Sequence, residues 1–88
     1  MPTIASFYGI FIRMYLRDHP PPHFQAIYQQ YEAFVAIETG KVIEGKLPFT
    51  AARLVREWTI AHKKELLANW QRERAGEGLE RIAGLDGD

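Results

Sequence analysis

The sequence predicts an α+β domain in β-β-β-β-α order, an antiparallel sheet of about four strands with one long C-terminal helix packed on one face. Within residues 1–47, apolar and polar residues alternate over several stretches with the period of two that strands show. From residue 50 to residue 75, apolar residues recur at three- and four-residue steps, as in an amphipathic helix. A chain of 88 residues, 47% of them hydrophobic, can build one core but not two. Residues 1–88 are therefore expected to form a single domain.

The first expected strand covers residues 8–17 and is followed by a proline-rich loop at residues 18–22. Gly9 is expected to mark a bend near the start of this strand. Three successive prolines lack the N–H donors that a sheet needs, so the loop cannot continue the strand. The alternation predicts a core face and an aromatic and basic face, namely Tyr8, Ile10, Ile12, Met14 and Leu16 against Phe11, Arg13, Tyr15 and Arg17.

The other strands are expected at residues 23–29, 31–39 and 41–47. Gln29-Gln30 is a poor two-residue turn, because a type I′ turn needs positive φ at both positions, so a longer connection or a local irregularity is expected there. Gly40 can supply the left-handed residue of the next turn. In the last strand, Ile43 and Leu47 are expected to face the core.

The helix is expected at residues 50–75, with Thr50 as its N-cap and Phe49 packed against Leu54. Gly76 is expected to end it, and residues 76–88 form a glycine-rich, acidic tail. Leu79, Ile82 and Leu85 of this tail can fold back onto the domain.

Such a helix would be about 39 Å long. That length exceeds what a sheet of short strands can cover, so its far end is expected to project. Trp70, with Leu66 on the same apolar stripe, is the expected contact with a partner protein there.

Composition excludes several classes of protein. The chain has no cysteine, which excludes disulfides and a thiol nucleophile. Its formal net charge is zero, which argues against an obligate nucleic-acid coat protein. No apolar run approaches the roughly 20 residues of a membrane span, and no signal peptide is visible at the start. A cytoplasmic protein without membrane association is therefore expected.

The densest polar chemistry surrounds the proline-rich loop. His19 and His23 could act as an acid/base pair, with Arg13 and Arg17 holding a phosphate and Tyr15 or Phe11 stacking on a base. This combination would be a metal-independent ribonuclease. In the alternative interpretation, His19 caps a loop, His23 starts a strand, and the basic face is an ordinary solvated surface.

A metal site is not expected. A fully extended polyproline spacer places His19 and His23 about 12 Å apart, too far for both to bind one zinc ion unless the loop turns, in which case Asp18 could be a third ligand. His62, between Trp58 and Leu66 on the helix stripe, is expected to be a packed, hydrogen-bonded core residue. No cofactor is expected either.

Several stretches together carry a resemblance to a known family. They are residues 1–4, Asp18-His19-Pro20-Pro21-Pro22-His23-Phe24, Glu44-Gly45-Lys46-Leu47-Pro48, Arg53–Trp58 and Leu66–Trp70. In these the chain resembles a family of small bacterial proteins, the domain of unknown function forty-one sixty. The family has no established activity. Its pattern usually continues His-Phe-His, whereas this chain has Gln25 at the last position, a residue that can contact a substrate but cannot donate a proton as an acid.

The resemblance also implies a partner. Genes of this family often lie beside those of another small family, the domain of unknown function twenty-four forty-two, which suggests a toxin–antitoxin-like pair. Our first hypothesis is a component of such a two-gene module that binds the neighbouring protein through the free sheet face or the helix end around Trp70. The alternative is the ribonuclease toxin. RNA and a second copy of the chain stay open as further partners.

Overall fold

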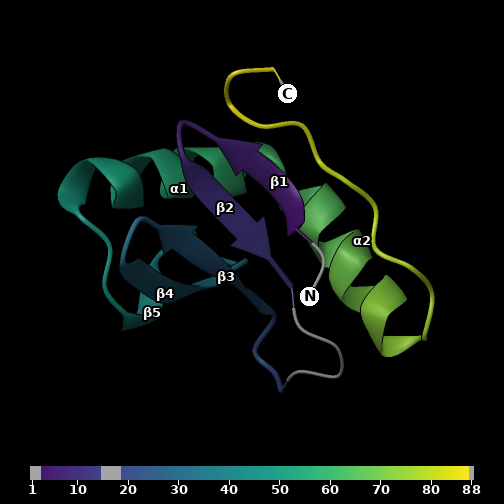
Figure 1. The fold of residues 1–88 in the computed structure, drawn as a ribbon. Coiled ribbons are helices and arrows are strands. Elements are labelled where there is room, and N and C mark those ends of the chain that lie inside the picture. The colour runs from purple at the N-terminus through teal and green to yellow at the C-terminus, as the bar shows by residue number, and fades with distance from the viewer. Residues whose placement is uncertain (1–2, 15–18, 88) are drawn as a thin grey trace.

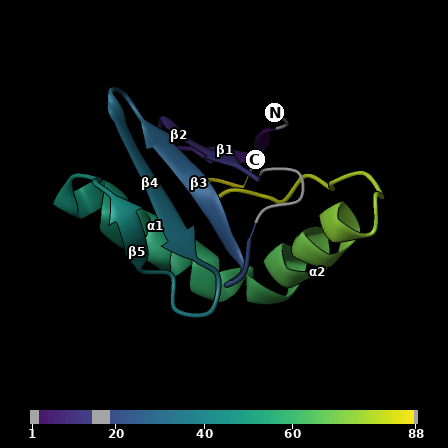
Figure 2. The same ribbon diagram turned by 90° about the horizontal axis from the view of Figure 1, so that it is seen from below.

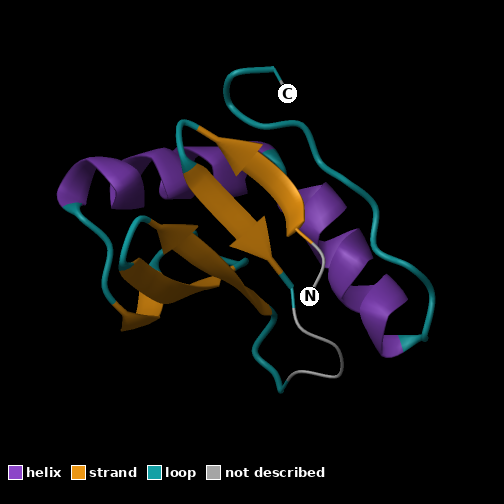
Figure 3. Cartoon of the chain, in the orientation of Figure 1, coloured by secondary structure: helices purple, strands orange, loops and turns teal. Residues whose placement is uncertain are grey.

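The computed structural model describes residues 3–14 and 19–87, and within them the α+β class is confirmed. One antiparallel sheet has the order β1-β2-β3-β4-β5 (Figure 1; Figure 3). Both helices lie on the same side of this sheet (Figure 2). The elements are β1 (Thr3–Phe7), β2 (Ile10–Arg13), β3 (His23–Tyr28), β4 (Tyr31–Ala36), β5 (Val42–Gly45), α1 (Phe49–Ala61) and α2 (Lys63–Arg74).

The first expected strand is in fact the second half of a hairpin, so the described sheet has five strands and not four. Phe7 lies opposite Ile10, and the two residues between them form a tight turn with positive φ, 50° at Tyr8 and 78° at Gly9. This is the combination of signs that type I′ hairpin turns require. Tyr8 is therefore 58% exposed and not a core residue, whereas Ile10, Ile12 and Met14 are buried as predicted.

The longer connection expected at Gln29-Gln30 is wrong. Tyr28 lies opposite Tyr31, which leaves a two-residue turn in which Gln29 has φ of 53°. The continuous pairing of β3 with β4, from His23 opposite Ala36 to this turn, determines the loop length in spite of its unfavourable residues. The next turn follows the prediction, because Gly40 has φ of 73° and donates its N–H to the Ala36 carbonyl at 2.8 Å.

β5 is an edge strand whose four residues are all exposed. Leu47 is buried as predicted, but Ile43 is 52% exposed and does not face the core. The pairing of β4 with β5 shifts register between Phe34 and Val35. Such an irregularity breaks the alternation, so spacing along the sequence no longer tells which residue faces inward.

The single helix expected at residues 50–75 is broken into α1 and α2 at His62, whose φ and ψ are −116° and 23°. The bend brings α2 back against the domain, so that Leu66 and Trp70 are 0% and 4% exposed. The expectation of a projecting helix end with an exposed Trp70 is therefore wrong. Neither helix of the described chain has the length and apolar character that crossing a membrane would require.

The N-terminal cap expected for the helix is wrong, whereas its expected C-terminal end is confirmed. α1 begins at Phe49, and the expected Thr50 cap is wrong because Pro48 is the N-cap and makes no side-chain hydrogen bond. Phe49 is 83% exposed, so the expected packing of its side chain against Leu54 does not bury it. At the other end, Gly76 terminates α2 as predicted, with the Glu77 N–H donating to the Arg72 carbonyl at 2.8 Å.

The C-terminal tail folds back, as the apolar residues in it suggested, and covers the edge of β1 (Figure 1). The Ile82 N–H donates to the Ile4 carbonyl at 2.7 Å, and the Ile82 side chain is 2% exposed. Asn69 of α2 makes two hydrogen bonds to the Glu80 backbone, one as donor at 2.7 Å and one as acceptor at 2.9 Å. The tail is thus part of the core, and one of the two sheet edges is closed by the chain itself.

We predict that Asn69→Ala lowers the free energy of unfolding by about 1–3 kcal/mol, because it leaves the N–H and the carbonyl of Glu80 without their partners. Urea denaturation followed by circular dichroism measures this change. Lys64→Ala, at an exposed position of the same helix, is the control. Equal stability of the two variants would show that the tail is not held by this pair of bonds.

Candidate functional site

The candidate site is the sheet face that has no helix on it, called here the outer face. Residues on this face alternate with the buried Phe24, Ala26 and Val35, which point to the helices. Two cross-strand rows run over it, because Arg13 lies opposite Gln25, and Phe11 opposite Ile27. The outer face consists of Phe11, Arg13, His23, Gln25, Ile27, Glu32, Phe34 and Glu44.

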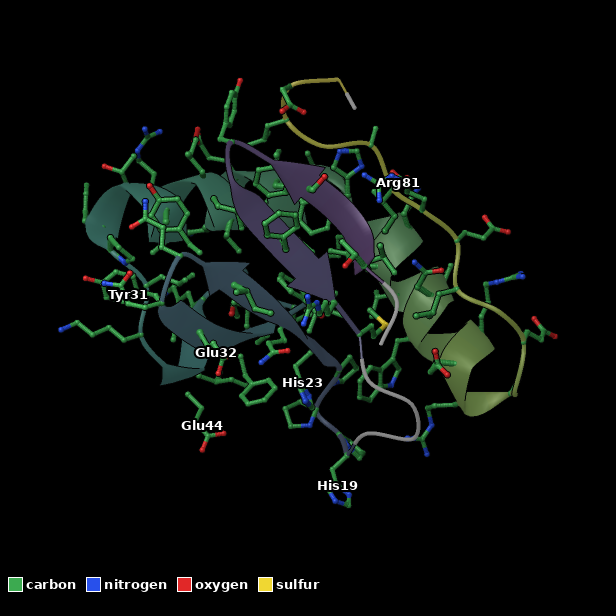
Figure 4. The ribbon with its side chains drawn as sticks, viewed as in Figure 1. His19, His23, Tyr31, Glu32, Glu44 and Arg81 are labelled. Atoms are coloured by element: carbon green, nitrogen blue, oxygen red, sulfur yellow. The ribbon has the colours of Figure 1, made fainter. Side chains whose placement is uncertain are left out.

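Three apolar side chains, those of Phe11, Ile27 and Phe34, lie on the outer face around Gln25. Phe11 is 46% exposed and sits beside the half-buried Ile27, while Phe34 lies beside Gln25 in the neighbouring row. Glu32 and Glu44 are exposed on the side of the face near β5, and His23 lies at the start of β3 (Figure 4). The face therefore has apolar side chains around Gln25, acidic groups toward one edge and basic or neutral polar groups toward the other.

Arg13 is the most unusual polar residue of the outer face. Its Nε is buried and has no hydrogen-bond partner among the described residues. Its cross-strand neighbour, Gln25, is only 6% exposed. A buried donor without an acceptor costs about 1–3 kcal/mol, so this position is energetically unfavourable in the chain by itself.

His23 is held in one orientation at the start of β3. Its Nδ1 lies 2.7 Å from the Pro21 carbonyl. A carbonyl can only accept, so Nδ1 carries the proton and donates it. The ring also contacts Phe34, with centroids 5.6 Å apart, and Trp70, with centroids 5.4 Å apart. His23 starts β3, as the alternative interpretation predicted, and these contacts also anchor the proline-rich loop to the sheet and to α2.

His19 does not join His23 in one site. It is exposed on the loop, and its side chain points away from the sheet, whereas His23 lies against it (Figure 4). Tyr15, Arg17 and Asp18 lie outside the described residues, so the phosphate clamp that includes Arg17 stays a prediction. Across the described part of the chain, no three His, Asp or Glu side chains are arranged to hold a metal ion.

Trp70 and Leu66, the expected partner contacts, belong to the core and do not offer a surface. Trp70 instead supports the ring of His23. His62 is half-buried, stacks on Trp58 with centroids 5.5 Å apart, and donates from Nδ1 to the Glu65 carboxylate at 2.7 Å. The prediction that His62 is a packed and hydrogen-bonded residue is thus confirmed.

The sequence interpretation missed one surface, a groove between α1 and β5. It packed Phe49 against Leu54, although Phe49 lies with Ala52, Arg53 and Arg56 on the side of α1 opposite to Val55 and Trp58. The signal was present in the helical spacing. Phe49, Arg53 and Arg56 follow one another at helical steps of four and three residues, on the side of the helix away from the buried stripe. Such spacing indicates a second, solvent-facing side of the helix.

One comparison with known proteins gives a match. A family model described as Domain of unknown function (DUF4160) matches residues 9–71. No curated protein and no solved structure matches the chain. The matched span includes β2 to β5, and therefore all residues of the outer face.

We predict that neutral His23 is the tautomer protonated at Nδ1, because the Pro21 carbonyl can only accept a hydrogen bond. Long-range proton–nitrogen NMR correlation of the imidazole rings distinguishes the two tautomers. His19 in the same spectrum serves as an internal reference, since it is exposed on the loop. A neutral His23 protonated at Nε2 would contradict the anchoring role.

Proposed function

This chain belongs to the Domain of unknown function (DUF4160) family, and we propose that it is a protein-binding module that engages a partner protein through its outer face. The partner is the small protein encoded by the adjacent gene, and the two form a toxin–antitoxin-like module. The observation that carries the proposal is Phe11, a large aromatic side chain of β2 that is 46% exposed on a sheet face without a helix.

Apolar contacts supply the first argument. Phe11 and Ile27 are cross-strand neighbours, and Phe34 extends the apolar surface into the adjacent row. Contiguous apolar patches on a small domain are typical of protein interaction sites. Aromatic residues are also over-represented among the residues that dominate binding energy.

The electrostatics of Arg13 supply the second argument. Its buried, unpaired Nε would gain an acceptor if a partner carboxylate or carbonyl reached the row of Arg13 and Gln25. Hydrogen bonds between a guanidinium and a carboxylate are among the stronger ones in proteins. Arg13 therefore supports binding of a partner that presents an oxygen acceptor within an otherwise apolar contact.

The acidic side chains of the outer face favour a protein over RNA. Glu32 and Glu44 are exposed on the same face and would repel a phosphate backbone. The net charge of zero adds no long-range attraction for a polyanion. The alternative, a metal-independent ribonuclease that uses His19 and His23, stays a prediction that no contact of the described residues favours.

We predict that Phe11→Thr weakens the complex with the adjacent gene product by about 2 kcal/mol or more, because it removes the exposed aromatic contact. Isothermal titration calorimetry on the co-expressed, separated proteins measures the affinity. Tyr8→Asn is the matched control, since it removes an exposed aromatic residue in the same hairpin but outside the outer face. Equal affinity of Phe11→Thr and wild type, or no complex at all, would overturn the proposal.

We further predict that Arg13→Met weakens partner binding without lowering the stability of the domain. Removing a buried, unpaired donor while keeping the volume should leave the free energy of unfolding unchanged or raise it. The same variant should bind the partner more weakly, because the acceptor on the partner loses its donor. Urea denaturation and calorimetry give the two quantities. A loss of stability above about 2 kcal/mol would indicate that Arg13 serves the fold.

A further inference from the structure

A groove between the first turns of α1 and the start of β5, called here the α1–β5 groove, lies apart from the outer face. Its volume is about 430 Å³, within the range of ligand-binding clefts. No residue of the outer face contributes to it. It is lined by Gly40, Lys41, Val42, Phe49, Ala52, Arg53 and Arg56.

The lining of the groove is largely apolar and is not used by the core. Phe49 is 83% exposed and Val42 is 37% exposed. Ile60, 62% exposed, follows Arg56 by four residues and so lies on the same side of α1. The opposite side of α1 carries the buried Ala51, Val55 and Trp58. α1 therefore has an apolar face toward the sheet and a second one that the folded domain leaves exposed.

The rim of the groove is cationic. It has three positive side chains, those of Lys41, Arg53 and Arg56, and no acidic residue among those that line it. Arg53 is paired with Glu57 at 2.8 Å. Lys41 and Arg56 form no ion pair with any other described residue. Charge complementarity thus calls for an occupant that is negatively charged as well as apolar.

The geometry of the groove is fixed at one end by Gly40. A Cβ atom at this position would lie 3.2 Å from the Cα and the carbonyl oxygen of Arg56, so a side chain here would push the turn and the helix apart by a few tenths of an ångström. Gly40 also needs its φ of 73° for the turn that leads into β5. The turn at Gly40 therefore sets the position of the start of β5 relative to Arg56 of α1 in the unliganded domain.

The strand beside the groove is open to pairing. β5 has β4 as its one neighbour in the described sheet, so its other edge presents backbone N–H and C=O groups. The opposite edge of the sheet differs, because the Ile82 N–H is bonded to the Ile4 carbonyl of β1. The chain closes one edge of its sheet with its own tail and leaves the edge beside the groove available.

We propose that the α1–β5 groove binds an extended, acidic and apolar segment of a partner protein. The segment adds to β5 as a further strand, which supplies main-chain hydrogen bonds. One of its apolar side chains covers Val42 and Phe49, and its carboxylates meet Lys41 and Arg56. This site shares no residue with the outer face, and its binding of the acidic segment does not require the outer face to be occupied.

The test uses a short fluorescent peptide of alternating leucine and glutamate as the probe, with the full-length protein. Fluorescence anisotropy is expected to show saturable binding that weakens as the ionic strength rises from about 0.01 M to about 1 M. Arg56→Glu should weaken binding by about tenfold or more. Lys64→Glu makes the same change in net charge at an exposed site on α2 and should leave the affinity unchanged.

Two further probes test the binding mode. A peptide of alternating leucine and lysine should not bind, and an acidic peptide N-methylated along one edge should bind much more weakly, because it has lost its N–H donors. Amide chemical-shift changes should map to residues 40–45 and 49–56. Circular dichroism of the Arg56→Glu variant confirms that it folds.

Three results would overturn the inference. They are the absence of saturable binding by the acidic peptide, equal binding by the basic peptide, and shift changes confined to the outer face. Each of these leaves the effect of Phe11→Thr on the complex with the adjacent gene product untouched, so the two proposals fail separately.

Discussion

The structure depends on the burial of one side chain, Trp58. It is 0% exposed and packs against Phe7 of β1 at 5.2 Å and Phe24 of β3 at 5.8 Å between ring centroids. Its Nε1 donates to the Ala83 carbonyl of the tail at 2.8 Å. A single indole therefore joins the sheet, α1 and the C-terminal segment. Because a buried indole N–H must find an acceptor, the tail that supplies the carbonyl is a requirement of the core.

This arrangement determines which surfaces remain for function. The helices occupy one sheet face, and the tail occupies the β1 edge (Figure 1; Figure 2). The outer face and the β5 edge are left uncovered, and several residues there are exposed or lack a partner in the fold. Phe11 and Phe49 are exposed aromatic residues, and Arg13 keeps a buried donor unpaired. Side chains whose placement costs stability without benefit to the fold are expected at binding sites.

The sequence correctly predicted which residues of β2 face the core, because that depends on local periodicity. It did not predict the turn and the helix break that tertiary contacts determine. The alternation through Ile10, Ile12 and Met14 placed Phe11 and Arg13 on the other face correctly. The turn at Tyr8 could not be foreseen, because tyrosine seldom adopts positive φ. The helix breaks at His62, where the sequence has neither proline nor glycine, so nothing local predicted it. The bend is stabilised by the packing of α2 against the domain. The error at Trp70 followed directly from assuming a straight helix.

We expect this small domain to bind its partner through the surfaces that its own helices and tail leave uncovered. Amide and side-chain NMR of the labelled chain, with and without the unlabelled adjacent gene product, locates the contact surface. Resonances of Phe11, Gln25 and Phe34 should change on complex formation, while those of Leu66 and Asn69 on the packed side of α2 should not. Changes centred on α2 and the tail, with an unaffected outer face, would contradict it.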